Sequence, residues 1–260
     1  MSFLQETPNA MRQALRQTLP AALMGVLALL FAQSPTALAE SEAALVPYQL
    51  AYAATLNGMD IDAKRELRVN GNRYEIITSA KNLLGSITEE GTFSLDEQGV
   101  IVDHGYEYER NIIGMKKTEE LSYDRTAGVA NYEAKKKKRQ VKLDGNYLNR
   151  LSYQVQLQRD LSNGQTTLQY QVIARGRLKD YNFEILGEET LDTPLGPFKT
   201  IKVKRVREDD DRQTIMWFAP ELNYLLVQLW QKEEDGDDHK LVIKSGTINR
   251  QPIVNGGDHS

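Results

Sequence analysis

Hydrophobic and polar positions alternate with a period of two along most of the chain from Tyr48 onward. In the segment 48–56, for example, Tyr48, Leu50 and Tyr52 fall on one face. This period is typical of β-strands with one buried face. Short runs of Gly, Asn and Asp separate such segments, and Asn57–Gly58 is a strong hairpin signal because both residues tolerate positive φ. The pattern predicts consecutive antiparallel strands joined by tight turns, as in an up-and-down sheet.

One segment, 147–162, follows a helical period instead. Its apolar positions cover a wide arc of the helix surface: Leu148, Leu151, Val155, Leu157 and Leu161. Residues 144–146 predict a turn and an N-cap, and Asn163–Gly164 predicts the C-cap. A helix with so wide an apolar surface needs cover on more than one side. The predicted fold is therefore mainly β, a curved antiparallel sheet or open barrel that wraps one α-helix.

The segment 192–204 predicts a rigid turn that feeds a strand. Pro194 and Pro197 restrict φ, and Gly196 can supply a positive φ. A strict alternation follows the turn and then slips in phase between Lys204 and Val206, which we interpret as a β-bulge. A rigid turn fixes the register of both strands that it joins, so we expect this segment to organise the second half of the sheet.

The segment 222–231 is the most apolar of the predicted strands. Alternation places Leu225, Val227 and Leu229 on one face and Leu226 and Trp230 on the other. Apolar residues on both faces exceed what one helix can cover, so the concave side of the sheet is predicted to hold a ligand. The predicted ligand-binding residues are Trp217, Leu225, Val227, Leu229 and Trp230. The alternative for both tryptophans is packing in the core, a frequent role of large aromatic residues.

The first 39 residues carry the pattern of an export signal. Arg12 and Arg16 precede the apolar run 21–32, and the small-x-small site Ala37-Leu38-Ala39 follows. These features together predict a signal peptide cleaved before Glu40. A membrane anchor is the alternative, but the apolar run is short for a bilayer core of about 30 Å. We expect a periplasmic protein with one β-rich domain, 40–250, and a flexible tail, 251–260, that is not integral to the membrane.

The composition narrows the possible functions. The net charge is −4 with both signs interspersed, which argues against a nucleic-acid binder. The chain has no cysteine, so neither disulfides nor cysteine nucleophiles are available. The three histidines are scattered, and the sequence motifs of serine nucleophiles, zinc proteases and phosphate-binding loops do not occur. Acidic runs such as 209–211 and 234–238 match no EF-hand loop. We predict no catalytic residue, no metal and no cofactor, and hence no enzymatic activity.

One basic run stands out from the interspersed charges. It comprises Lys135, Lys136, Lys137, Lys138 and Arg139. Such a run can dock anionic headgroups or an acidic protein partner. The alternative is a solvated strand end whose lysines discourage edge pairing.

The export signal is followed by three segments in a fixed order: Tyr48 to Tyr52, Thr193 to Thr200, and Trp217 to Leu225. In these features the chain resembles the DUF3108 family of exported bacterial proteins. The resemblance covers residues 45 to 250 and departs from the family pattern at Leu226, where such strands often carry proline. The family has no assigned activity, so the resemblance implies a periplasmic β-rich domain. The architecture is similar to lipoprotein-carrier folds, a likeness at the level of the fold only.

Two functional hypotheses follow from these patterns. The first is a non-enzymatic binding or accessory protein that holds an apolar or lipid-like ligand inside the curved sheet. The second is a structural or interaction protein of the cell envelope that docks an envelope partner through 135–139. A ligand cavity in the structure favours the first hypothesis, and loss of a partner after charge reversal in 135–139 favours the second.

Overall fold

The computed structural model describes residues 45–56, 58–207, 212–236 and 238–254. Within these residues, fifteen strands belong to one antiparallel sheet, which one α-helix and one short 3-10 helix accompany. The elements are β1 Tyr48–Leu56, β2 Met59–Asn70, β3 Arg73–Asn82, β4 Gly85–Leu95, β5 Ile101–Ile112, β6 Met115–Asp124, β7 Val129–Ala134, β8 Lys137–Lys142, α1 Ser152–Ser162, β9 Leu168–Ala174, β10 Arg177–Thr193, β11 Gly196–Val206, β12 Gln213–Ala219, η1 Pro220–Leu222, β13 Leu225–Lys232, β14 Asp238–Ile248 and β15 Gln251–Pro252.

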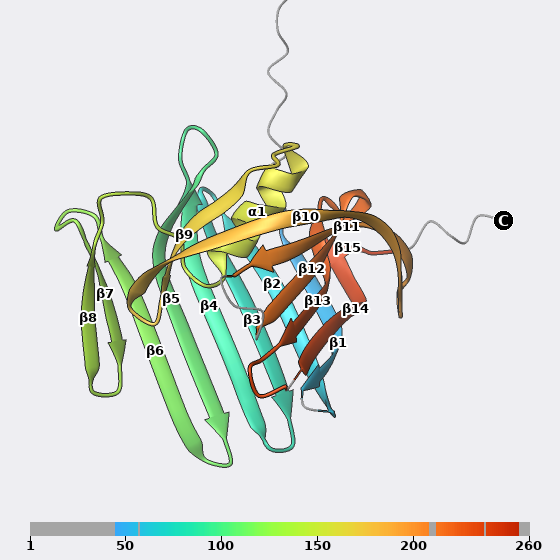
Figure 1. Cartoon of the computed structure of the whole chain (residues 1–260), viewed down its shortest axis with the longest axis horizontal. Helices are drawn as coiled ribbons and strands as arrows, with labels where there is room; N and C mark the ends of the chain where they lie inside the picture. Colours follow the sequence, from blue (N-terminus) through green and yellow to red (C-terminus); the bar gives the residue numbers. More distant parts are fainter. Residues whose placement is uncertain (1–44, 57, 208–211, 237, 255–260) are drawn as a thin grey trace, which may run out of the picture. The chain divides into compact units, whose positions relative to one another are not determined.

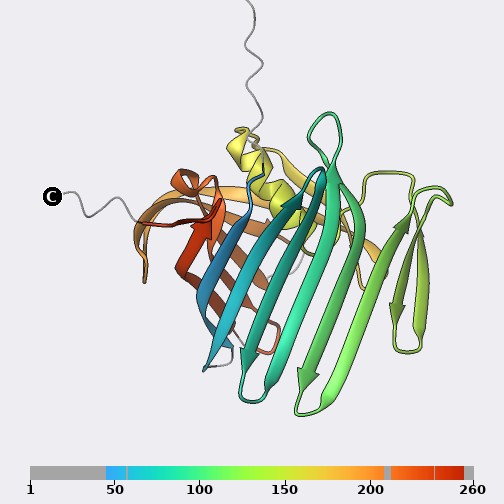
Figure 2. The same cartoon turned by 180° about the vertical axis from the view of Figure 1, so that it is seen from behind.

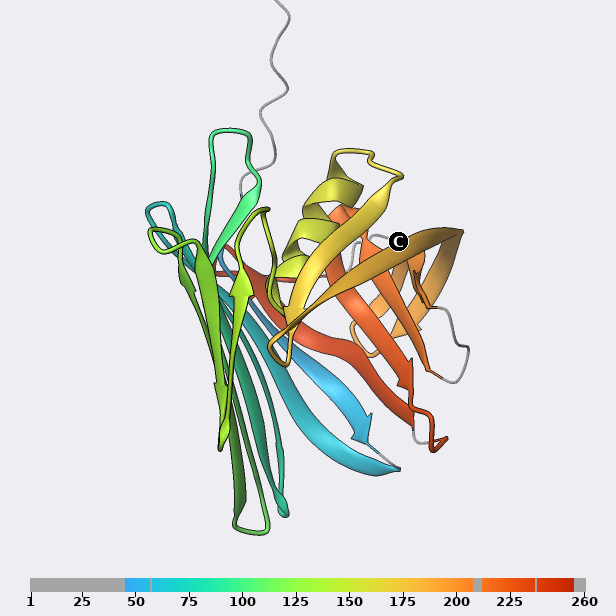
Figure 3. The ribbon, with the colours of Figure 1, turned by 60° about the vertical axis from the view of Figure 1, so that its left-hand side comes forward.

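The strands follow the chain order around the sheet, with one jump. The order in space is β8-β7-β6-β5-β4-β3-β2-β1-β14-β13-β12-β11-β10-β9, so β1 pairs with β14 and joins the two halves. Figures 1 and 2 show the long strands β2 to β6 side by side, as the predicted up-and-down order requires. In Figure 3 the two halves of the sheet face each other, and α1 lies between them at one end.

The two ends of the sheet approach each other where β7 and β8 meet the β9–β10 turn. Arg139 of β8 donates a hydrogen bond from Nη1 to the carbonyl oxygen of Arg175 in that turn, at 3.3 Å. A Cβ atom at Gly176 would lie 2.6 Å from Cδ1 of Tyr132 in β7. The sheet is thus a nearly closed, barrel-like structure around one helix, and the predicted fold class is confirmed.

The predicted turn in 192–204 is present and joins β10 to β11. The Thr193 hydroxyl accepts a hydrogen bond from the backbone N–H of Leu195, with a distance of 3.1 Å. The same hydroxyl donates a hydrogen bond to the carbonyl oxygen of Gly196, with a distance of 2.7 Å. The predicted bulge between Lys204 and Val206 is wrong, because β11 pairs with β10 without a shift as far as Val206. The irregularity lies on the partner strand instead, between Ile185 and Gly187.

The predicted helix is present but begins later than expected. It runs from Ser152 to Ser162 and buries an apolar surface that includes Val155, Leu157 and Leu161. The C-cap at Asn163 is confirmed. The predicted start near Leu148 is wrong, because this residue forms a parallel bridge with Val172 of β9 instead. Its N–H and C=O groups bond to the free edge of β9, so backbone pairing with a strand replaces the first helical turn.

The predicted export segment, 1–39, lies outside the described residues. At the other end of the chain, β15 pairs with β14, and Ile253 is buried and donates its N–H to the carbonyl oxygen of Gly246 at 2.9 Å. Residues 251–253 are therefore attached to the sheet and do not belong to the predicted flexible tail. Residues 255–260 lie outside the described part.

Candidate ligand site on the concave face

The concave face of the sheet is the face that carries α1, and a buried polar network fixes the start of this helix. Asn149 accepts the N–H groups of Leu151 and Ser152 at its Oδ1, at 2.8 and 2.9 Å. It also donates its own backbone N–H to the carboxylate of Asp103 on β5, at 2.6 Å. The Ser152 hydroxyl donates to the same carboxylate at 2.5 Å. Burial raises the pKa of Asp103 to about 7, against the opposing effect of the hydrogen bonds from Ser152 and Asn149.

Gly91 on β4 makes room for this network. A Cβ atom there would lie 3.2 Å from the side-chain amide of Asn149. Because the network links β5, β4 and the residues just before α1, it sets the direction in which the first helical turn points along the concave face.

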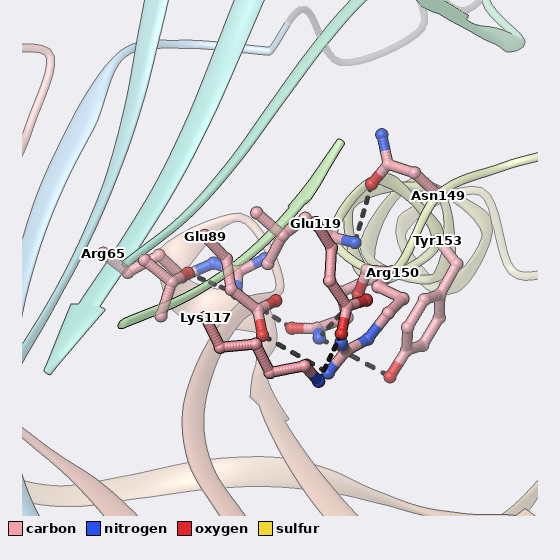
Figure 4. Close-up of polar contacts among 10 residues, drawn as sticks. Arg65, Glu89, Lys117, Glu119, Asn149, Arg150 and Tyr153 are labelled. Carbon is pink, nitrogen blue, oxygen red and sulfur yellow. Dashed lines mark hydrogen bonds and ion pairs between the residues drawn. The ribbon is translucent and has the colours of Figure 1, made fainter. Parts of the chain in front are cut away.

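Arg150 extends from the start of the helix onto a patch of tyrosine rings. It pairs with Glu89 of β4, Nη2 to Oε1 at 3.3 Å, and its guanidinium lies 5.7 Å from the ring centre of Tyr108. Figure 4 shows Arg150 beside Glu89 and Glu119. Burial disfavours the charge on Arg150, but Glu89 and Tyr106 outweigh this effect and raise the pKa of the guanidinium. The arginine is therefore held charged in a partly dry environment.

A second ion pair lies beside the first. Lys117 Nζ lies 2.6 Å from Oε1 of Glu119 on β6, and the Glu119 side chain is only 2% exposed. Burial alone would raise the pKa of Glu119, but the bond to Lys117 prevails and the pKa is lowered. The other carboxylate oxygen, Oε2, is buried and makes no hydrogen bond of normal geometry to the described residues, and the same holds for the Tyr106 hydroxyl. The Glu119 carboxylate could accept a hydrogen bond from a bound molecule or from water, and the Tyr106 hydroxyl could donate or accept one.

Arg65 of β2 differs from both pairs because its neighbours are neutral. It is 7% exposed and donates from Nη1 to the side-chain oxygen of Gln154 in α1, at 2.8 Å. It donates longer bonds to the hydroxyl groups of Tyr48, at 3.4 Å, and Thr78, at 3.5 Å. Among the described residues, no carboxylate lies within ion-pair distance of this guanidinium.

Two further arginines come from the opposite half of the sheet. Arg205 of β11 lies over the ring of Tyr181, with its guanidinium carbon 3.3 Å from the ring centre. Tyr181 in turn makes an edge contact with Tyr153 of α1, with ring centres 5.1 Å apart. Arg207 donates to the hydroxyl of Thr214 at 2.9 Å. Tyr153 thus lies among arginines from both halves of the sheet, and its burial raises the pKa of its hydroxyl to about 12.

An apolar strip lies next to the arginines on the same face. Ile61 lies four residues before Arg65 on β2. Because side chains at even spacing on a strand share a face, both point to the concave side. Ile61 pairs with Ala54 of β1, Ala54 with Leu241 of β14, and Leu241 with Leu229 of β13. Directly opposite residues share a face. Ile61, Leu229 and Leu241 are only half-buried, so the concave face combines an incompletely covered apolar strip with a cationic cluster.

The predicted ligand-binding residues do not share one surface. A register shift in the pairing of β12 with β13 places Leu225 opposite Ala219 and Leu229 opposite Met216. Positions 216 and 219 differ by an odd number, so they lie on opposite faces of the strand. The prediction that Leu225, Val227 and Leu229 share one face is wrong, because one extra residue on β13 reverses the alternation.

Their individual environments also differ. Trp217 lies on the face opposite to Met216, donates its indole N–H to Glu189 and carries Lys202 over its ring, 5.2 Å from the ring centre. Trp230 is half-buried and donates to Asp238 at 3.4 Å. Val227 is fully buried. Only Leu229 belongs to the concave apolar strip.

Leu225 lines a separate small cavity at the far end of α1. The cavity has a volume of about 170 Å³ and is bordered by Leu45, Tyr48, Gln158, Pro220 and Tyr224, among others. Pockets for small molecules typically measure roughly 300–1,000 Å³. This cavity is therefore too small to enclose a whole lipid.

The predicted docking residues lie at the edge of the sheet. Lys135 and Lys136 form the turn between β7 and β8, and the other three belong to β8, the last strand on that side. Lys138 pairs with Glu133 at 3.1 Å. Lys138 and Arg139 also border an open, polar depression of about 520 Å³ on β6, β7 and β8. Their role in docking stays a prediction.

Among the described residues, no group of His, Cys, Asp or Glu side chains is arranged to hold a metal ion. The described helices include none that is long and apolar enough to cross a membrane.

Comparisons with known proteins identify a family and a shared fold. The model of the family described as "Protein of unknown function (DUF3108)" matches residues 48–244. A search of the curated proteins finds no match. A β-barrel-like protein of the DUF1849 domain from Brucella abortus superposes with a TM-score of 0.51 at 11% identity, over 80% of this chain and 99% of that one. At this identity the likeness shows a shared fold.

Two other solved structures superpose less closely. One is a candidate lipoprotein from Parabacteroides distasonis, with a TM-score of 0.30 at 12% identity over 78% of this chain and 96% of that one. The other is a candidate exported protein from Bacteroides fragilis, with a TM-score of 0.27 at 11% identity over the same shares.

Proposed function

Because the chain belongs to the DUF3108 family of proteins of unknown function and folds as a nearly closed barrel around one helix, we propose that it is a non-enzymatic binding protein of the periplasm. Its ligand is apolar or lipid-like and lies on the concave face of the sheet. The export pattern of residues 1–39 supports the location. The lack of nucleophile and cofactor motifs in the sequence supports a binding role over a catalytic one.

The observation that carries this proposal is the half-buried apolar strip on the concave face. Ile61, Leu229 and Leu241 pack against the core on one side and are partly open on the other, although α1 lies on the same face. Half-covered apolar side chains inside a curved sheet gain free energy when a ligand completes their burial, by roughly 25 cal/mol for each Å² removed from water. A ligand along this strip would continue the cover that α1 gives at the other end.

Native mass spectrometry tests this function directly. The mature chain is purified gently from its own envelope, its intact mass is measured, and the sample is then extracted with organic solvent. We expect a fraction of the protein to carry one extra species that is released on denaturation and found in the organic phase. An apo mass together with no binding of an added acyl probe would contradict the proposal.

Docking of an envelope partner through 135–139 stays a separate hypothesis. The exposed lysines of the β7–β8 turn at the edge of the sheet are compatible with it. The double variant Lys136→Glu/Lys137→Glu tests it, because neither lysine has an ion-pair partner among the described residues. If an envelope partner binds here, charge reversal abolishes its recovery in a pull-down. Unchanged recovery would remove the hypothesis.

A further inference from the structure

In the described part of the chain, no carboxylate lies within ion-pair distance of Arg65, Arg205 or Arg207 on the concave face, and this feature bears on the chemistry of the ligand. We propose that the site recognises an amphiphile with an anionic headgroup, a carboxylate or a phosphate, and that Arg65 and Arg205 bind this headgroup beside the first turn of α1. The inference rests on the proposed function, since it assumes that the concave face holds a ligand, and it adds the chemical class of that ligand.

Arg65 is a buried charged residue whose neighbours among the described residues are neutral. A charged group is costly to bury unless an opposite charge or a full set of hydrogen bonds compensates it. Arg65 is 7% exposed, and its hydrogen-bond partners among the described residues are two hydroxyl groups and one amide oxygen. All three bonds use Nε or Nη1, which leaves the donors of Nη2 without a partner among the described residues. A carboxylate or phosphate matches the fork geometry of a guanidinium and would supply the missing charge.

Arg205 repeats this situation on the opposite half of the sheet. Its Nε is buried and makes no hydrogen bond to the described residues. The contact of its guanidinium is with the face of the Tyr181 ring. No described carboxylate lies within ion-pair distance of Arg205 or of the neighbouring Arg207. Desolvation, followed by repulsion from Arg205, lowers the pKa of Arg207.

A continuous set of contacts links Arg65 to Arg205. Arg65 bonds to Gln154, whose amide group lies 3.5 Å from the hydroxyl of Tyr153. Tyr153 meets the ring of Tyr181, and Tyr181 carries Arg205. Both arginines therefore flank the first turn of α1, and an anion beside Tyr153 would lie between cations from the two halves of the sheet.

The charge balance of the whole cluster favours an anion. Among the described residues, the charged side chains around the first turn of α1 are Arg65, Lys117, Arg150, Arg205, Arg207, Asp103, Glu89 and Glu119, five cations against three carboxylates. The opposite, convex face of β4 to β7 is acidic, because Glu90, Glu107, Glu120 and Glu133 form one directly opposed row. Concave sites lined by one sign of charge raise the local concentration of the opposite ion. An anion is thus attracted to the concave face and repelled from the convex face.

The apolar strip makes the ligand an amphiphile rather than a free anion. Ile61 lies four residues from Arg65 on β2, a distance of about 13 Å along an extended strand. A headgroup at Arg65 would therefore allow an acyl chain to reach Ile61 and the half-buried leucines beyond it. The anionic head and the apolar chain are each matched by a neighbouring part of one surface.

The test compares two probes that differ only in the headgroup charge. We would titrate the mature protein with the fluorescent fatty acid cis-parinaric acid and with its uncharged methyl ester. The variants are Arg65→Gln, Arg65→Lys and the control Arg68→Gln, which removes an exposed arginine paired with Glu66 and Glu75 on the other face of β2. Circular dichroism confirms that each variant is folded.

We expect the wild type to bind the acid about tenfold to a hundredfold more tightly than the ester, because a hydrogen bond to a charged group is worth about 1.5–3 kcal/mol, or one to two factors of ten. Arg65→Gln should reduce this ratio at least about tenfold, while binding of the ester changes little. Arg65→Lys should retain part of the preference, and Arg68→Gln all of it. Competition with oleic acid and with oleoyl lysophosphatidic acid then ranks carboxylate against phosphate.

The outcomes separate the two proposals. Equal binding of acid and ester by the wild type would overturn the anionic site and leave the proposed function standing. Binding of neither probe would overturn both. Binding of inorganic phosphate at Arg65 without binding of any acyl probe would show that the site serves a free anion, which also overturns the amphiphile. A retained preference in a folded Arg65→Gln variant would exclude Arg65 as the headgroup ligand.

Discussion

Arg65 occupies a position that the strand pattern assigns to the core. Its neighbours on the same face of β2, Ala63 and Leu67, are buried apolar residues. Alternation alone therefore places a charged residue on the buried face, and this conflict is the one signal in the sequence that points to the site. The pattern cannot show that the surrounding partners are neutral, because Gln154 and Tyr48 come from distant parts of the chain.

Asp103 predicts a pH dependence of stability. Burial raises its pKa from 3.8 to about 7, so between about pH 4 and pH 7 the folded state binds more protons than the unfolded chain. Stability contributed by this group should therefore fall as the pH rises through that window, by up to about 1.4 kcal/mol per pH unit.

Urea unfolding of the wild type and of Asp103→Asn, measured from pH 4 to pH 8, checks this prediction. The variant should lack the downward slope that Asp103 contributes, whatever its absolute stability. Burial and the neighbouring Glu75 also raise the pKa of Glu90 to about 7. This group contributes equally to the stability of both proteins, so its effect cancels in the difference. Parallel stability curves for the two proteins would show that Asp103 stays ionised in the folded state.

At the level of single elements, the sequence predicts periodic segments well and irregularities poorly. The turn between β10 and β11 and the end of α1 are as predicted, because Pro, Gly and Asn impose local geometry. The late start of α1 and the extra residue in β13 depend on pairing with β9 and β12, which no local pattern records. That extra residue explains why the apolar residues of β13 do not form one ligand surface.

The contact between the two ends of the sheet can be measured with a pair of glycine variants. Gly176 and Gly128 both have φ of 68°, but a Cβ atom at Gly176 would overlap Tyr132, whereas nothing lies within 4 Å at Gly128. Gly128→Ala should cost only the backbone strain, and Gly176→Ala should cost about 1–3 kcal/mol more because of the overlap. Equal losses in urea unfolding would mean that the β9–β10 turn does not press on β7.

The acidic row on the convex face predicts a stabilising variant. Glu107 of β5 lies directly between Glu90 of β4 and Glu120 of β6. Like charges in directly opposed positions destabilise a sheet by about 0.2–1 kcal/mol per pair. Glu107→Gln should therefore raise the free energy of unfolding at pH 8, as urea unfolding can measure. A loss of stability at pH 8 would indicate that an unrecognised cation compensates the row.

At the scale of the whole molecule, the fold class and the family follow from the sequence because both rest on long-range periodicity and ordered motifs. The arrangement of charge does not follow from the sequence. Strand alternation places adjacent residues on opposite faces, and closure of the sheet then brings inward-facing residues from distant strands together. Closure brings cations from β2, β6 and β11 together around α1, while the acidic row stays on the convex side. The lipid-like ligand was inferred from apolar excess alone, and the inner charges add its anionic headgroup.

The central claim is that the concave face holds the ligand, and photo-crosslinking tests it most directly. The mature protein is illuminated with a palmitic acid analogue that carries a diazirine near the carboxylate, and labelled peptides are located by mass spectrometry. Labelling of Tyr153, Gln154 and the inward residues of β2, competed by oleic acid, is the predicted result. Competed labelling confined to the Trp217 side of β12 or to the convex face of β4 to β7 would contradict the account.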